Sequence, residues 1–543
     1  MRNGYSPSEF VERCREEGLY VSEEALHSDL YGELVKLDNA NKNGVWARII
    51  KNSFAPLFVG TVDFVAGNPP WITWVNLPEQ YRAQTGYLWQ QYKIFPHKGL
   101  KARLGHAKDD ISILFTYVSS DAYLSANGRL GFVITQSLFK SKGGGQGFRR
   151  FRLGDKEFLG VRKVDDLSNL QPFEGATNRT AVLILDKGVR TKYPVSYSLW
   201  SKVESGTVSL ESSIHDVMDY TLQTDLAAFP IDPTDATSAW ITGPEESLRV
   251  ILPRIGPSDY VARMGAHFGA SGVFWSQILD NQGKGRLLIQ NTGGGKKHVP
   301  VRTASIEHDL VYPLIRGRDM ERWFSEPNLG VIMVQDEHNL SRPMPLKTLK
   351  RTYPLTYQHL LQFEKLLRGC AILAQFFDPT VDPFYSTYQV GSYSFAPIKV
   401  LWRQVADKLD ACVASSFELD GLPTRPCIPA DSLCAVALHT EDEAHYLCAM
   451  LNSSIARYII KSYVALHPSP HILEYLRIRK WDEQNVTAMK LSRLSRECHE
   501  KMRKRDAVDL TDQEAQIDEA AATLWDIDPK ELAFIKSAIE IDV

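Results

Sequence analysis

The stretch TVDFVAGNPPW, residues 61–71, decides the fold of this chain. Its first half, Val62 to Ala66, is short and largely apolar, as in a strand that lies between two neighbours of a parallel sheet. The Gly-Asn-Pro-Pro sequence that follows ends the strand, because proline lacks the N–H group that a sheet ladder needs. The stretch therefore predicts a buried strand that carries the turn Asn68-Pro69-Pro70-Trp71 at its carboxyl end.

Further segments with the pattern of strands or helices lie before and after this stretch. GRLGFVIT at 128–135 and TAVLILD at 180–186 are typical of two further buried strands, whereas residues 44–59 and 110–125 have helical spacing. Apolar strands that alternate with helices indicate an α/β domain with a mostly parallel sheet. In open sheets of this type, ligands bind beyond the carboxyl ends of the strands, where the turn at Asn68 is placed.

The rest of the chain divides by its sequence pattern. Residues 5–38 have helical spacing, with candidate N-caps at Ser6 and Ser22. After about residue 205 the pattern changes to short mixed segments rich in Pro, Gly and Trp, which indicates a separate α+β region. The last stretch, 490–540, is charged and helical, and we expect a solvated cap there rather than a partner-binding helix.

The composition limits the number of domains and excludes some classes of protein. With 543 residues, 44% of them hydrophobic, the chain is long enough for two or three domains. Its formal net charge of -3 excludes the strongly basic balance that marks many nucleic-acid-binding proteins, so any such site must be local. The seven cysteines form no CxxC pair, so we predict no zinc or other metal site and no disulfide framework. No apolar run is long enough to span a bilayer and the N-terminus lacks the pattern of a secretory signal, so we expect a cytoplasmic protein.

The residue types of the turn suit one chemical task. An exocyclic amine is a poor nucleophile, because its lone pair is delocalised into the ring. The side-chain oxygen of Asn68 and a proline carbonyl can accept hydrogen bonds from the two N–H groups and so localise that lone pair. Proline adds rigidity, and Trp71 offers a flat face on which a base can stack. A simple strand-ending turn is the alternative, but the apolar strand before it and the aromatic residue after it favour a catalytic turn.

On these residues the sequence resembles a known family. GVWARIIKNSFAPLFVGTVDFVAGNPPWITW, residues 44–74, is similar to the gamma-class adenine-N6 DNA methyltransferases, above all the large modification and fused restriction-modification enzymes of phage defence. The family motif is Asn/Asp/Ser-Pro-Pro-Tyr/Phe/Trp, and residues 68–71 match it in full. Later segments agree in order and spacing with the family's catalytic domain and then with its target-recognition regions: 113–139, 171–188, 311–323, 399–414 and 447–460.

The resemblance implies a fold, a reaction and a set of residues. The fold is α/β, a partial Rossmann-like methyltransferase sheet followed by an α+β target-recognition domain. The reaction is methyl transfer from S-adenosylmethionine to an adenine that is flipped out of double-stranded DNA. Asn68, Pro69, Pro70 and Trp71 are the implied catalytic residues, and Phe173 is implied to hold the flipped base against Trp71. The implied domains are a helical lead-in at 1–60, the substrate half of the catalytic domain at 61–205, a target-recognition domain at 206–488 and a helical C-terminal tail at 489–543.

The sequence departs from the family at the methyl-donor site. In the family, a strand, a Gly-rich loop and an acidic residue for the donor lie upstream of the catalytic turn. The residues before Asn68 contain no such loop, and the glycine clusters at 143–147 and 293–295 come too late in the chain. We therefore expect S-adenosylmethionine as cofactor, with a donor site that this chain does not encode. A split enzyme with a second subunit, a truncated reading frame and a specificity factor without catalysis all fit this pattern.

Basic residues gather in local clusters that we expect to contact DNA phosphates, with a solvated loop as the alternative for each. One cluster follows the catalytic turn, one surrounds three glycines, and one follows the strand at 128–135. In the recognition region, further polar residues are candidates for base or backbone contacts, although Arg318 has Asp319 and Glu321 as alternative partners. The residues concerned are Lys98, Lys101 and Arg103; Lys296 and Lys297; Lys140, Lys142, Arg149, Arg150 and Arg152; and, in the recognition region, Arg316, Arg318, Arg403 and Gln404.

Two other roles stay open. A non-catalytic DNA target-recognition subunit would keep the pocket as a relic, but the joint presence of Asn68, Trp71 and Phe173 argues against a relic. An RNA or protein glutamine methyltransferase also uses an Asn-Pro-Pro-aromatic turn, but the long region after the catalytic sheet argues against that class.

Other chemistries find little support in the sequence. Pro426-Cys427 resembles the nucleophile pair of C5-cytosine methyltransferases, but it lies after the catalytic sheet and lacks a following Gln, so we interpret it as structural. We identify no nuclease motif, and we interpret Asp109-Asp110 and Asp165-Asp166 as helix starts or solvated loops.

Overall fold

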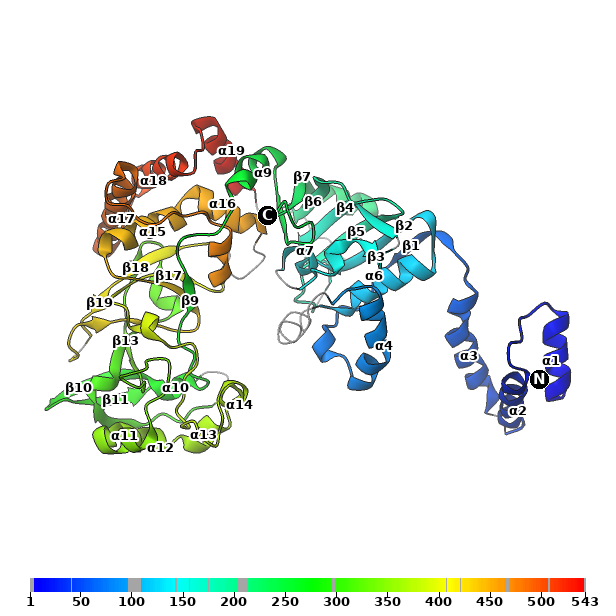
Figure 1. Ribbon diagram of the computed structural model, residues 1–543, viewed down its shortest axis with the longest axis horizontal. Helices are drawn as coiled ribbons and strands as arrows, with labels where there is room; N and C mark the ends of the chain where they lie inside the picture. Colours follow the sequence, from blue (N-terminus) through cyan, green and yellow to red (C-terminus); the bar gives the residue numbers. More distant parts are fainter. Residues whose placement is uncertain are drawn as a thin grey trace.

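One mixed β-sheet occupies the first half of the chain in the computed structural model (Figure 1). The structure describes residues 4–40, 42–95, 109–141, 144–155, 157–173, 175–203, 212–294, 298–406, 408–419, 421–463, 468–505 and 508–541. The sheet has the strand order β1-β2-β5-β4-β6-β7-β8, with the short β3 paired to β4. Its strands are β1 Val62–Gly67, β2 Leu124–Thr135, β3 Arg152–Leu153, β4 Glu157–Asn169, β5 Thr180–Lys187, β6 Val195–Lys202, β7 Thr221–Pro230 and β8 Trp240–Gly243.

The sheet is mixed, so the expectation of a mostly parallel sheet is wrong. Parallel pairs join β1 to β2 and β4 to β6, whereas β2–β5, β5–β4, β6–β7 and β7–β8 are antiparallel. The cause lies in the connections, because a parallel crossover needs a dozen or more residues and usually a helix. The loop at 170–179 between β4 and β5 is too short for that, so the chain turns back on itself.

Strand β1 lies at the edge of this sheet, so the expectation of a buried strand is wrong in that respect. Among the described residues β1 pairs with β2 alone. Val62 is 38% exposed and Phe64 is 74% exposed, and Val65 is half-buried. An apolar sequence predicts that a strand prefers two neighbours, but it does not show whether both are present.

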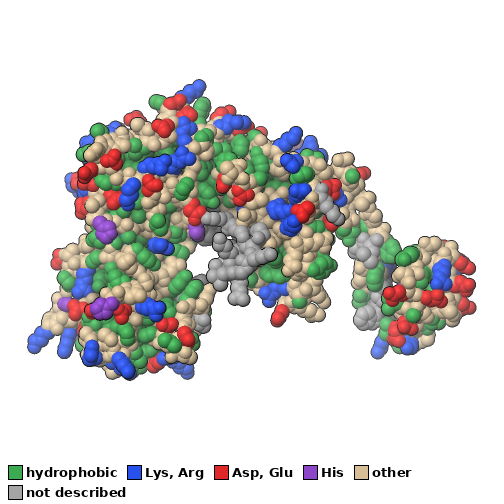
Figure 2. Space-filling model, viewed as in Figure 1, with side chains coloured by type: hydrophobic (Ala, Val, Ile, Leu, Met, Phe, Trp, Pro, Cys, Tyr) green, Lys and Arg blue, Asp and Glu red, His purple; other side chains and the backbone are tan. Residues whose placement is uncertain are grey.

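Helices cover the sheet and precede it. Helix α6, Ile111–Ala122, packs on β2 and buries Ile113 and Tyr117 completely. Before the sheet come α1 Pro7–Glu16, α2 Glu24–Asn39 and α3 Asn43–Phe54, which Figure 1 shows at the N-terminal end of the molecule, away from the sheet. Figure 2 shows acidic side chains gathered over α1 and α2. The remaining helices of this half are α4 Glu79–Gln91, α7 Ser137–Lys140 and α8 Ile214–Asp219.

The first N-cap prediction is confirmed and the second is not. The side chain of Ser6 accepts a hydrogen bond from the backbone N–H of Glu9, and Glu9 bonds back to Ser6, which makes a capping box. Helix α2 is preceded by Glu23, which makes no side-chain cap bond, so Ser22 is not the cap.

Among the described residues, the second half contains two larger sheets, two two-stranded sheets (β14-β15 and β19-β20) and a group of helices. A six-stranded sheet has the order β12-β11-β10-β16-β13-β21, and a four-stranded sheet has the order β18-β17-β22-β9. Figure 1 shows the helices from α15 onward at one end of this half and the six-stranded sheet at the other. The strands are β9 Ala262–Met264, β10 Trp275–Gly283, β11 Arg286–Asn291, β12 Thr303–Glu307, β13 Val311–Ile315, β14 Met320–Glu321, β15 Phe324–Ser325, β16 Leu329–Ile332, β17 Ile398–Arg403, β18 Ala411–Ala414, β19 Ser416–Phe417, β20 Arg425–Pro426, β21 Ile428–Pro429 and β22 Leu433–Leu438. The helices are α9 Glu245–Ile251, α10 Ser271–Phe274, α11 Leu346–Thr352, α12 Pro354–Leu361, α13 Glu364–Arg368, α14 Ala371–Phe376, α15 Glu441–Asn452, α16 Ser454–Tyr463, α17 Val486–Lys504, α18 Thr511–Leu524 and α19 Pro529–Ile539.

The C-terminal helices belong to a core, so the expectation of a solvated cap is wrong. Leu491, Cys498, Ile517 and Ile535 are almost completely buried, in one cluster with residues from β17, β22 and α15. Charged residues dominate the composition of these helices, but their apolar residues recur on one face, and that face packs inward. The domain limits at residues 205 and 488 stay predictions, although the first sheet continues past residue 205 as far as β8.

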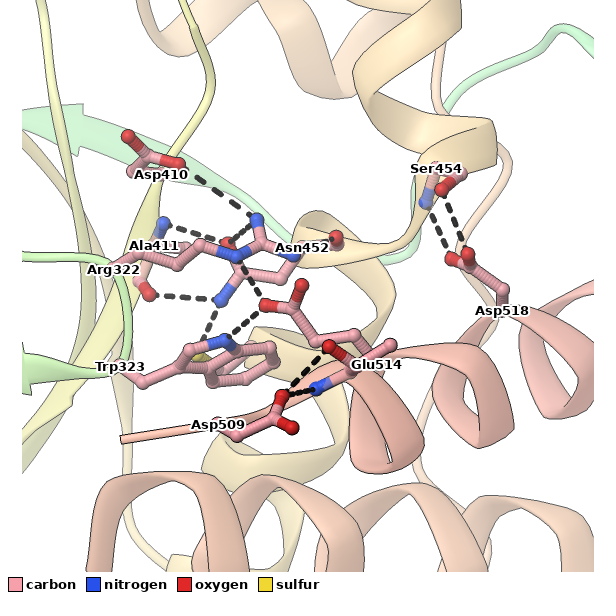
Figure 3. A network of polar contacts seen from close by, with 11 residues as sticks. Arg322, Trp323, Asp410, Ala411, Asn452, Ser454, Asp509, Glu514 and Asp518 are labelled. Carbon is pink, nitrogen blue, oxygen red and sulfur yellow. Dashed lines mark hydrogen bonds and ion pairs between the residues drawn. The ribbon is translucent and has the colours of Figure 1, made fainter. Parts of the chain in front are cut away.

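A polar network fastens helix α18 to the strands of this half (Figure 3). The carboxylate of Glu514 accepts hydrogen bonds from Nε of Arg322 at 2.6 Å and from Nε1 of Trp323 at 2.8 Å. Arg322 also donates to the side-chain and backbone oxygens of Asn452. Burial tends to raise the pKa of Glu514, but Arg322 and Trp323 more than offset this, and the pKa is lowered. The ionised carboxylate is therefore part of the fold.

No helix within the described parts of the chain combines the length and the apolar character that a bilayer crossing requires.

Candidate functional site

The turn after β1 is partly exposed at the surface. Asn68 and Pro70 are exposed, whereas Pro69 is buried and Trp71 is half-buried. The indole Nε1 of Trp71 donates a hydrogen bond to the backbone oxygen of Val133 in β2 at 3.1 Å. The turn is thereby fastened to the strand beside β1, while the amide of Asn68 stays accessible to a ligand.

Phe173 lies beside this turn, as the resemblance implies. It belongs to the loop between β4 and β5, far from Trp71 in the sequence. The ring centroids of Trp71 and Phe173 are 5.0 Å apart, and the ring planes meet at 74°. The fold therefore brings together two aromatic side chains and an exposed amide at one edge of the sheet.

The segment after the turn is fixed by the start of α6. The backbone N–H of Ile111 donates to the oxygen of Ile72 at 2.9 Å, and that of Trp74 donates to the oxygen of Asp109 at 2.8 Å. Asp110 is the N-cap of α6, so the interpretation of Asp109-Asp110 as a helix start is confirmed. Both aspartates are nevertheless buried, at 1% and 4% exposure, and neither lies in a solvated loop.

Asp110 joins three elements near the site. Its carboxylate accepts hydrogen bonds from the backbone N–H of Ser112 at 2.9 Å and from Oγ1 of Thr135, at the end of β2, at 2.6 Å. Burial raises the pKa of Asp110, although these hydrogen bonds lower it. The residue thus connects the helix, the end of β2 and the segment after the turn, a positioning role that no motif revealed. The only signal in the sequence was an acidic pair directly before an apolar helix.

Asp109 has a different environment. Its pKa is raised to about 7, mainly by burial and to a smaller degree by the neighbouring Asp110, although a hydrogen bond from the backbone N–H of Gly145 and the charge of Arg149 oppose the rise. That hydrogen bond is 2.5 Å long and reaches the carboxylate from the turn that follows α7. A buried carboxyl group with a raised pKa therefore lies two residues from Ile111, and the backbone of the same residue accepts a hydrogen bond from Trp74 in the segment after the turn.

Another buried carboxylate lies in β4, beside the residue that follows the carboxyl end of β2. Asp166 is 2% exposed in β4 and accepts hydrogen bonds from Nε2 of Gln136 at 3.1 Å and from the hydroxyl of Tyr197. Burial and the nearby Asp166 hold the pKa of Tyr197 well above its usual value. The interpretation of Asp165-Asp166 as a helix start or solvated loop is therefore wrong, because both residues are in a central strand.

Two of the predicted DNA-contacting clusters lie outside the described residues. These are Lys98, Lys101 and Arg103 in the first cluster and Lys296 and Lys297 in the second, together with Lys142 of the third.

Two members of the third cluster are buried in the structure. Lys140 is 7% exposed and donates to Oγ1 of Thr242 and, at 2.7 Å, to the backbone oxygen of Ser462 in α16. Burial lowers its pKa to about 8. Arg149 is 2% exposed and donates to the backbone oxygens of Leu138 and Thr237. These two side chains hold the fold together, so the prediction that they contact phosphates is wrong for them.

Arg316 and Arg318, two of the predicted DNA-contacting residues, have different environments. The guanidinium of Arg316 is 7% exposed and donates to both carboxylate oxygens of Asp319, at 2.6 and 2.7 Å, and to Oδ1 of Asn328 at 2.6 Å. Arg318 is exposed and has no ion-pair partner among the described residues. The two lie beside a hollow of about 540 Å³ that is also lined by Gln277, Thr292, Asp319, Asn328 and Leu329. This placement favours a structural role for Arg316 and leaves Arg318 as the accessible cation.

Arg403 and Cys427 are structural as well. Arg403 donates to the backbone oxygens of Gly317 and Met320, so it fixes the loop that carries Arg318. Cys427 is fully buried, and burial raises the pKa of its thiol, which suits the interpretation that it is not a nucleophile.

The side of β1 that faces away from β2 is open among the described residues. In an open sheet, ligands bind beyond the carboxyl ends of neighbouring strands. On that side of β1 the described chain places no strand, and the side chain of Phe64 is 74% exposed.

Comparisons with known proteins point to restriction-modification enzymes. Residues 15–173 match the model of the Eco57I restriction-modification methylase family. The Type II methyltransferase M.NspV of Nostoc sp. (strain ATCC 29411 / PCC 7524) is 30% identical over 166 residues, which are 29% of this chain and 31% of the relative. The chain thus matches about a third of the length of this curated relative.

Solved structures of the same kind match over more of the chain, at low identity. The Type IIL restriction-modification enzyme MmeI, solved in complex with DNA, is 10% identical, with a TM-score of 0.49, over 88% of this chain and 57% of that chain. The ATP-dependent Type ISP restriction-modification enzyme LlaBIII, solved bound to DNA, is 10% identical, with a TM-score of 0.39, over 84% of this chain and 30% of that chain. The segment that matches the family model, residues 15–173, includes β1, the turn at Asn68 and Phe173.

Proposed function

We propose that this chain is the substrate-binding component of a site-specific adenine-N6 DNA methyltransferase of a restriction-modification or phage-defence system. The methyl donor is S-adenosylmethionine, supplied by a site outside the described residues. The observation that carries the proposal is the exposed amide of Asn68 at the end of β1, with the rings of Trp71 and Phe173 beside it.

The chemistry of the chain's own residues supports an amine as the reacting group. The Asn68 side-chain oxygen and the carbonyl of Pro69 are acceptors for the two N–H groups of an exocyclic amine. Trp71 is fixed by its hydrogen bond to Val133 and gives a planar surface for the base. The contribution of this chain is therefore the orientation of the base and the localisation of the amine lone pair.

A flipped base also explains why two aromatic residues meet at the site. The N6 atom of adenine cannot be reached within the stacked duplex, so the base has to leave the helix. Once unstacked, it loses its neighbours, and an aromatic side chain on either face replaces them. The partial Rossmann-like sheet that we propose for residues 61–205 places this pair at the carboxyl end of β1.

The alternative is a DNA target-recognition subunit without catalysis. The accessible Arg318 and the hollow beside it support DNA recognition under either proposal. We favour the catalytic component, because Asp110 and Thr135 hold the segment after the turn in a buried network that a recognition subunit does not need.

The test is the methylation of adenine in the genome of cells that carry the chain. A strain without the gene is complemented with the wild-type chain, with Asn68→Ala or with Asn76→Ala, and adenine methylation is mapped by single-molecule sequencing. We expect the wild type and the control Asn76→Ala, which removes an exposed amide outside the turn, to restore methylation at one sequence motif. We expect Asn68→Ala to abolish it while the purified variant still binds DNA. Full methylation with Asn68→Ala would refute the catalytic assignment.

A further inference from the structure

A hollow where β9, α14 and the loop after β17 meet differs in its chemistry from the hollow beside Arg318. It has a volume of about 440 Å³. Three glutamine side chains line it, together with two aromatic rings, a methionine, a histidine and an aspartate. The described residues that line it include no lysine and no arginine. This lining suits a neutral ligand with hydrogen-bonding edges rather than a phosphate, which basic side chains would bind.

The amides of the three glutamines are largely free to bind a ligand. The backbone N–H of Gln404 donates to the oxygen of Ser432 at 2.9 Å, but its side-chain Nε2 contacts only the sulfur of Met264, at 3.9 Å. The side chains of Gln375 and Gln389 make no hydrogen bond within the described chain. Gln389 and Gln404 are half-buried, so their amides are placed where a ligand, rather than the fold, completes their hydrogen bonds.

Gln389 also has a strained backbone. Its φ angle is 56°, in the left-handed region that favours glycine. The residue before it is fixed, because Tyr388 and His267 exchange two backbone hydrogen bonds of 2.9 Å. Residues that the surrounding structure holds in this region concentrate at ligand-binding positions. The fold therefore holds the side chain of Gln389 at the hollow in a conformation that glycine would adopt more easily.

An aromatic pair and an imidazole complete the lining. The rings of Phe376 and Tyr388 are stacked, with centroids 3.8 Å apart and planes at 11°, and Phe376 is 44% exposed. Nδ1 of His267 lies 2.5 Å from a carboxylate oxygen of Asp431, so the imidazole already engages this carboxylate. The groups left for a ligand are thus the amides and the exposed apolar ring beside them.

We propose that this site, which we call the glutamine hollow, reads an A·T base pair of the DNA target from the major groove. The proposal rests on the proposed function, which makes duplex DNA the substrate. A glutamine amide pairs in two hydrogen bonds with N6 and N7 of adenine, and an apolar side chain contacts the methyl group of thymine. One amide of Gln389 and Gln404 takes the adenine edge, the other donates to O4 of the thymine, and Phe376 contacts the methyl group.

A G·C pair fits the glutamine hollow less well. Guanine presents two acceptors in the major groove, for which arginine or lysine is the matching side chain, and cytosine has no methyl group. The pair read here also differs from the pair that contains the methylated adenine, because that adenine has left the duplex. The glutamine hollow therefore contributes to the choice of the site and not to the reaction.

The position of the glutamine hollow allows a duplex to reach it. Figure 1 shows α14, which carries Phe376, on the side of the second half that faces the first sheet. A duplex that contacts both halves passes along this side. The loop of Arg318 is fixed to the same place, because the backbone N–H of Gly317 donates to Oγ of Ser432 at 3.0 Å. One serine thus holds both the backbone of Gln404 and the residue before the accessible cation.

The test selects binding sites from randomised duplex DNA with the purified full chain, so that it does not depend on methylation. We expect the wild type and Asn68→Ala to select the same sequence motif. We expect Gln389→Gly and Gln404→Ala to lose the preference for one A·T position, by about 5- to 150-fold, and to keep the other positions. The control Gln484→Ala alters an exposed glutamine outside the glutamine hollow and is expected to keep the whole motif.

The glycine variant also separates base reading from a structural role. Gln389→Gly relieves the left-handed backbone, so we expect its unfolding temperature to be close to or above that of the wild type. A residue that only supports the fold would behave in the opposite way. A variant that unfolds at a lower temperature and keeps the motif would identify Gln389 as structural.

The outcomes separate the two proposals. A wild-type chain that selects no motif, a motif that both variants leave unchanged, an effect at a G·C position, or a loss of binding to every sequence would overturn the reading of an A·T pair. If the motif changes as expected but cells with the wild-type chain contain no methylated adenine, the base-reading proposal stands and the proposed function fails. If adenine is methylated in the motif and both variants keep the motif, the reverse holds.

Discussion

The indole ring of Trp71 meets the ring of Phe173 edge-on, with centroids 5.0 Å apart and planes at 74°. This is the geometry of a direct aromatic contact, for which centroid separations of about 4.5–7 Å are typical. A base held between the two rings would need one such contact on each of its faces, so the present separation leaves no space for it. Under the proposed function, the loop that carries Phe173 therefore moves when a base enters, and Trp71, which is hydrogen-bonded to β2, is the stationary side.

The first prediction concerns Phe173. Phe173→Ala removes one stacking surface, which is worth about 1–3 kcal/mol per base, so we expect the methylation rate to fall by roughly 5- to 150-fold. Phe173→Tyr keeps the ring and is expected to stay close to the wild type. The rate is measured with labelled S-adenosylmethionine in extracts of the complemented strain. Equal rates for the alanine and tyrosine variants would contradict a stacking role.

The second prediction is a pH dependence that originates at Asp109. Burial raises the pKa of this carboxyl to about 7, so its favourable contribution to stability is complete below about pH 4 and is lost as the pH rises through 7. Asp109→Asn cannot ionise and avoids that loss. We expect the variant to unfold at a higher temperature than the wild type at pH 8, and the difference to shrink at pH 5. The difference in unfolding temperature is expected to be roughly 2–4 °C for each kcal/mol of difference in stability.

Calorimetry at the two pH values checks this expectation, and Asp280→Asn serves as the control because Asp280 is exposed. A variant that follows the wild type at both pH values would mean that Asp109 does not titrate in this range.

The third prediction concerns the different roles of two neighbouring arginines, Arg316 and Arg318. Arg318→Ala removes an accessible cation, so we expect weaker DNA binding and a salt slope reduced by about 1. Arg316→Ala removes the ion-pair partner of Asp319 and is expected mainly to lower the free energy of unfolding. Fluorescence anisotropy with labelled DNA at several salt concentrations, together with thermal unfolding, distinguishes the two effects. An unchanged slope for Arg318→Ala would remove this residue from the DNA interface.

The fourth prediction concerns the network around Glu514. Glu514→Gln removes the charge that faces Arg322, and we expect it to lower the free energy of unfolding by about 1–3 kcal/mol. The matched control is Glu497→Gln, in the exposed Arg493–Glu497 pair of α17, for which we expect a loss of no more than about 0.5 kcal/mol. Denaturant unfolding followed by tryptophan fluorescence gives both values. Equal losses of the free energy of unfolding in the two variants would show that the network stabilises the fold no more than a surface ion pair does.

The local sequence pattern predicted the elements around the site and their order. The strand at Val62, the strand at 180–186, the helix after Asp110 and the cap at Ser6 follow from apolar spacing and from the hydrogen-bonding capacity of short polar side chains. Such signals lie within a few residues of the element that they specify, so a single sequence contains them in full.

Relations between distant segments could not be predicted in the same way. Whether β1 has one neighbour or two depends on other segments, so its apolar sequence was compatible with both arrangements. The burial of Lys140 depends on Thr242 and Ser462, which lie 102 and 322 residues away in the chain. The positive charge of Lys140 therefore predicted a surface position, whereas in the fold this side chain makes its contacts in the interior.

The ion pair of Arg254 with Glu531 has a consequence for the order in which the parts of the protein fold during synthesis. These residues are 277 positions apart, and the backbone oxygen of Phe534 accepts a hydrogen bond from Ser247 across a similar distance. At about 5–20 residues per second, a ribosome needs roughly 14–55 s to pass from one partner to the other. The first sheet can close during that time, whereas the core that contains α9 stays open to chaperones and proteases until α19 has emerged.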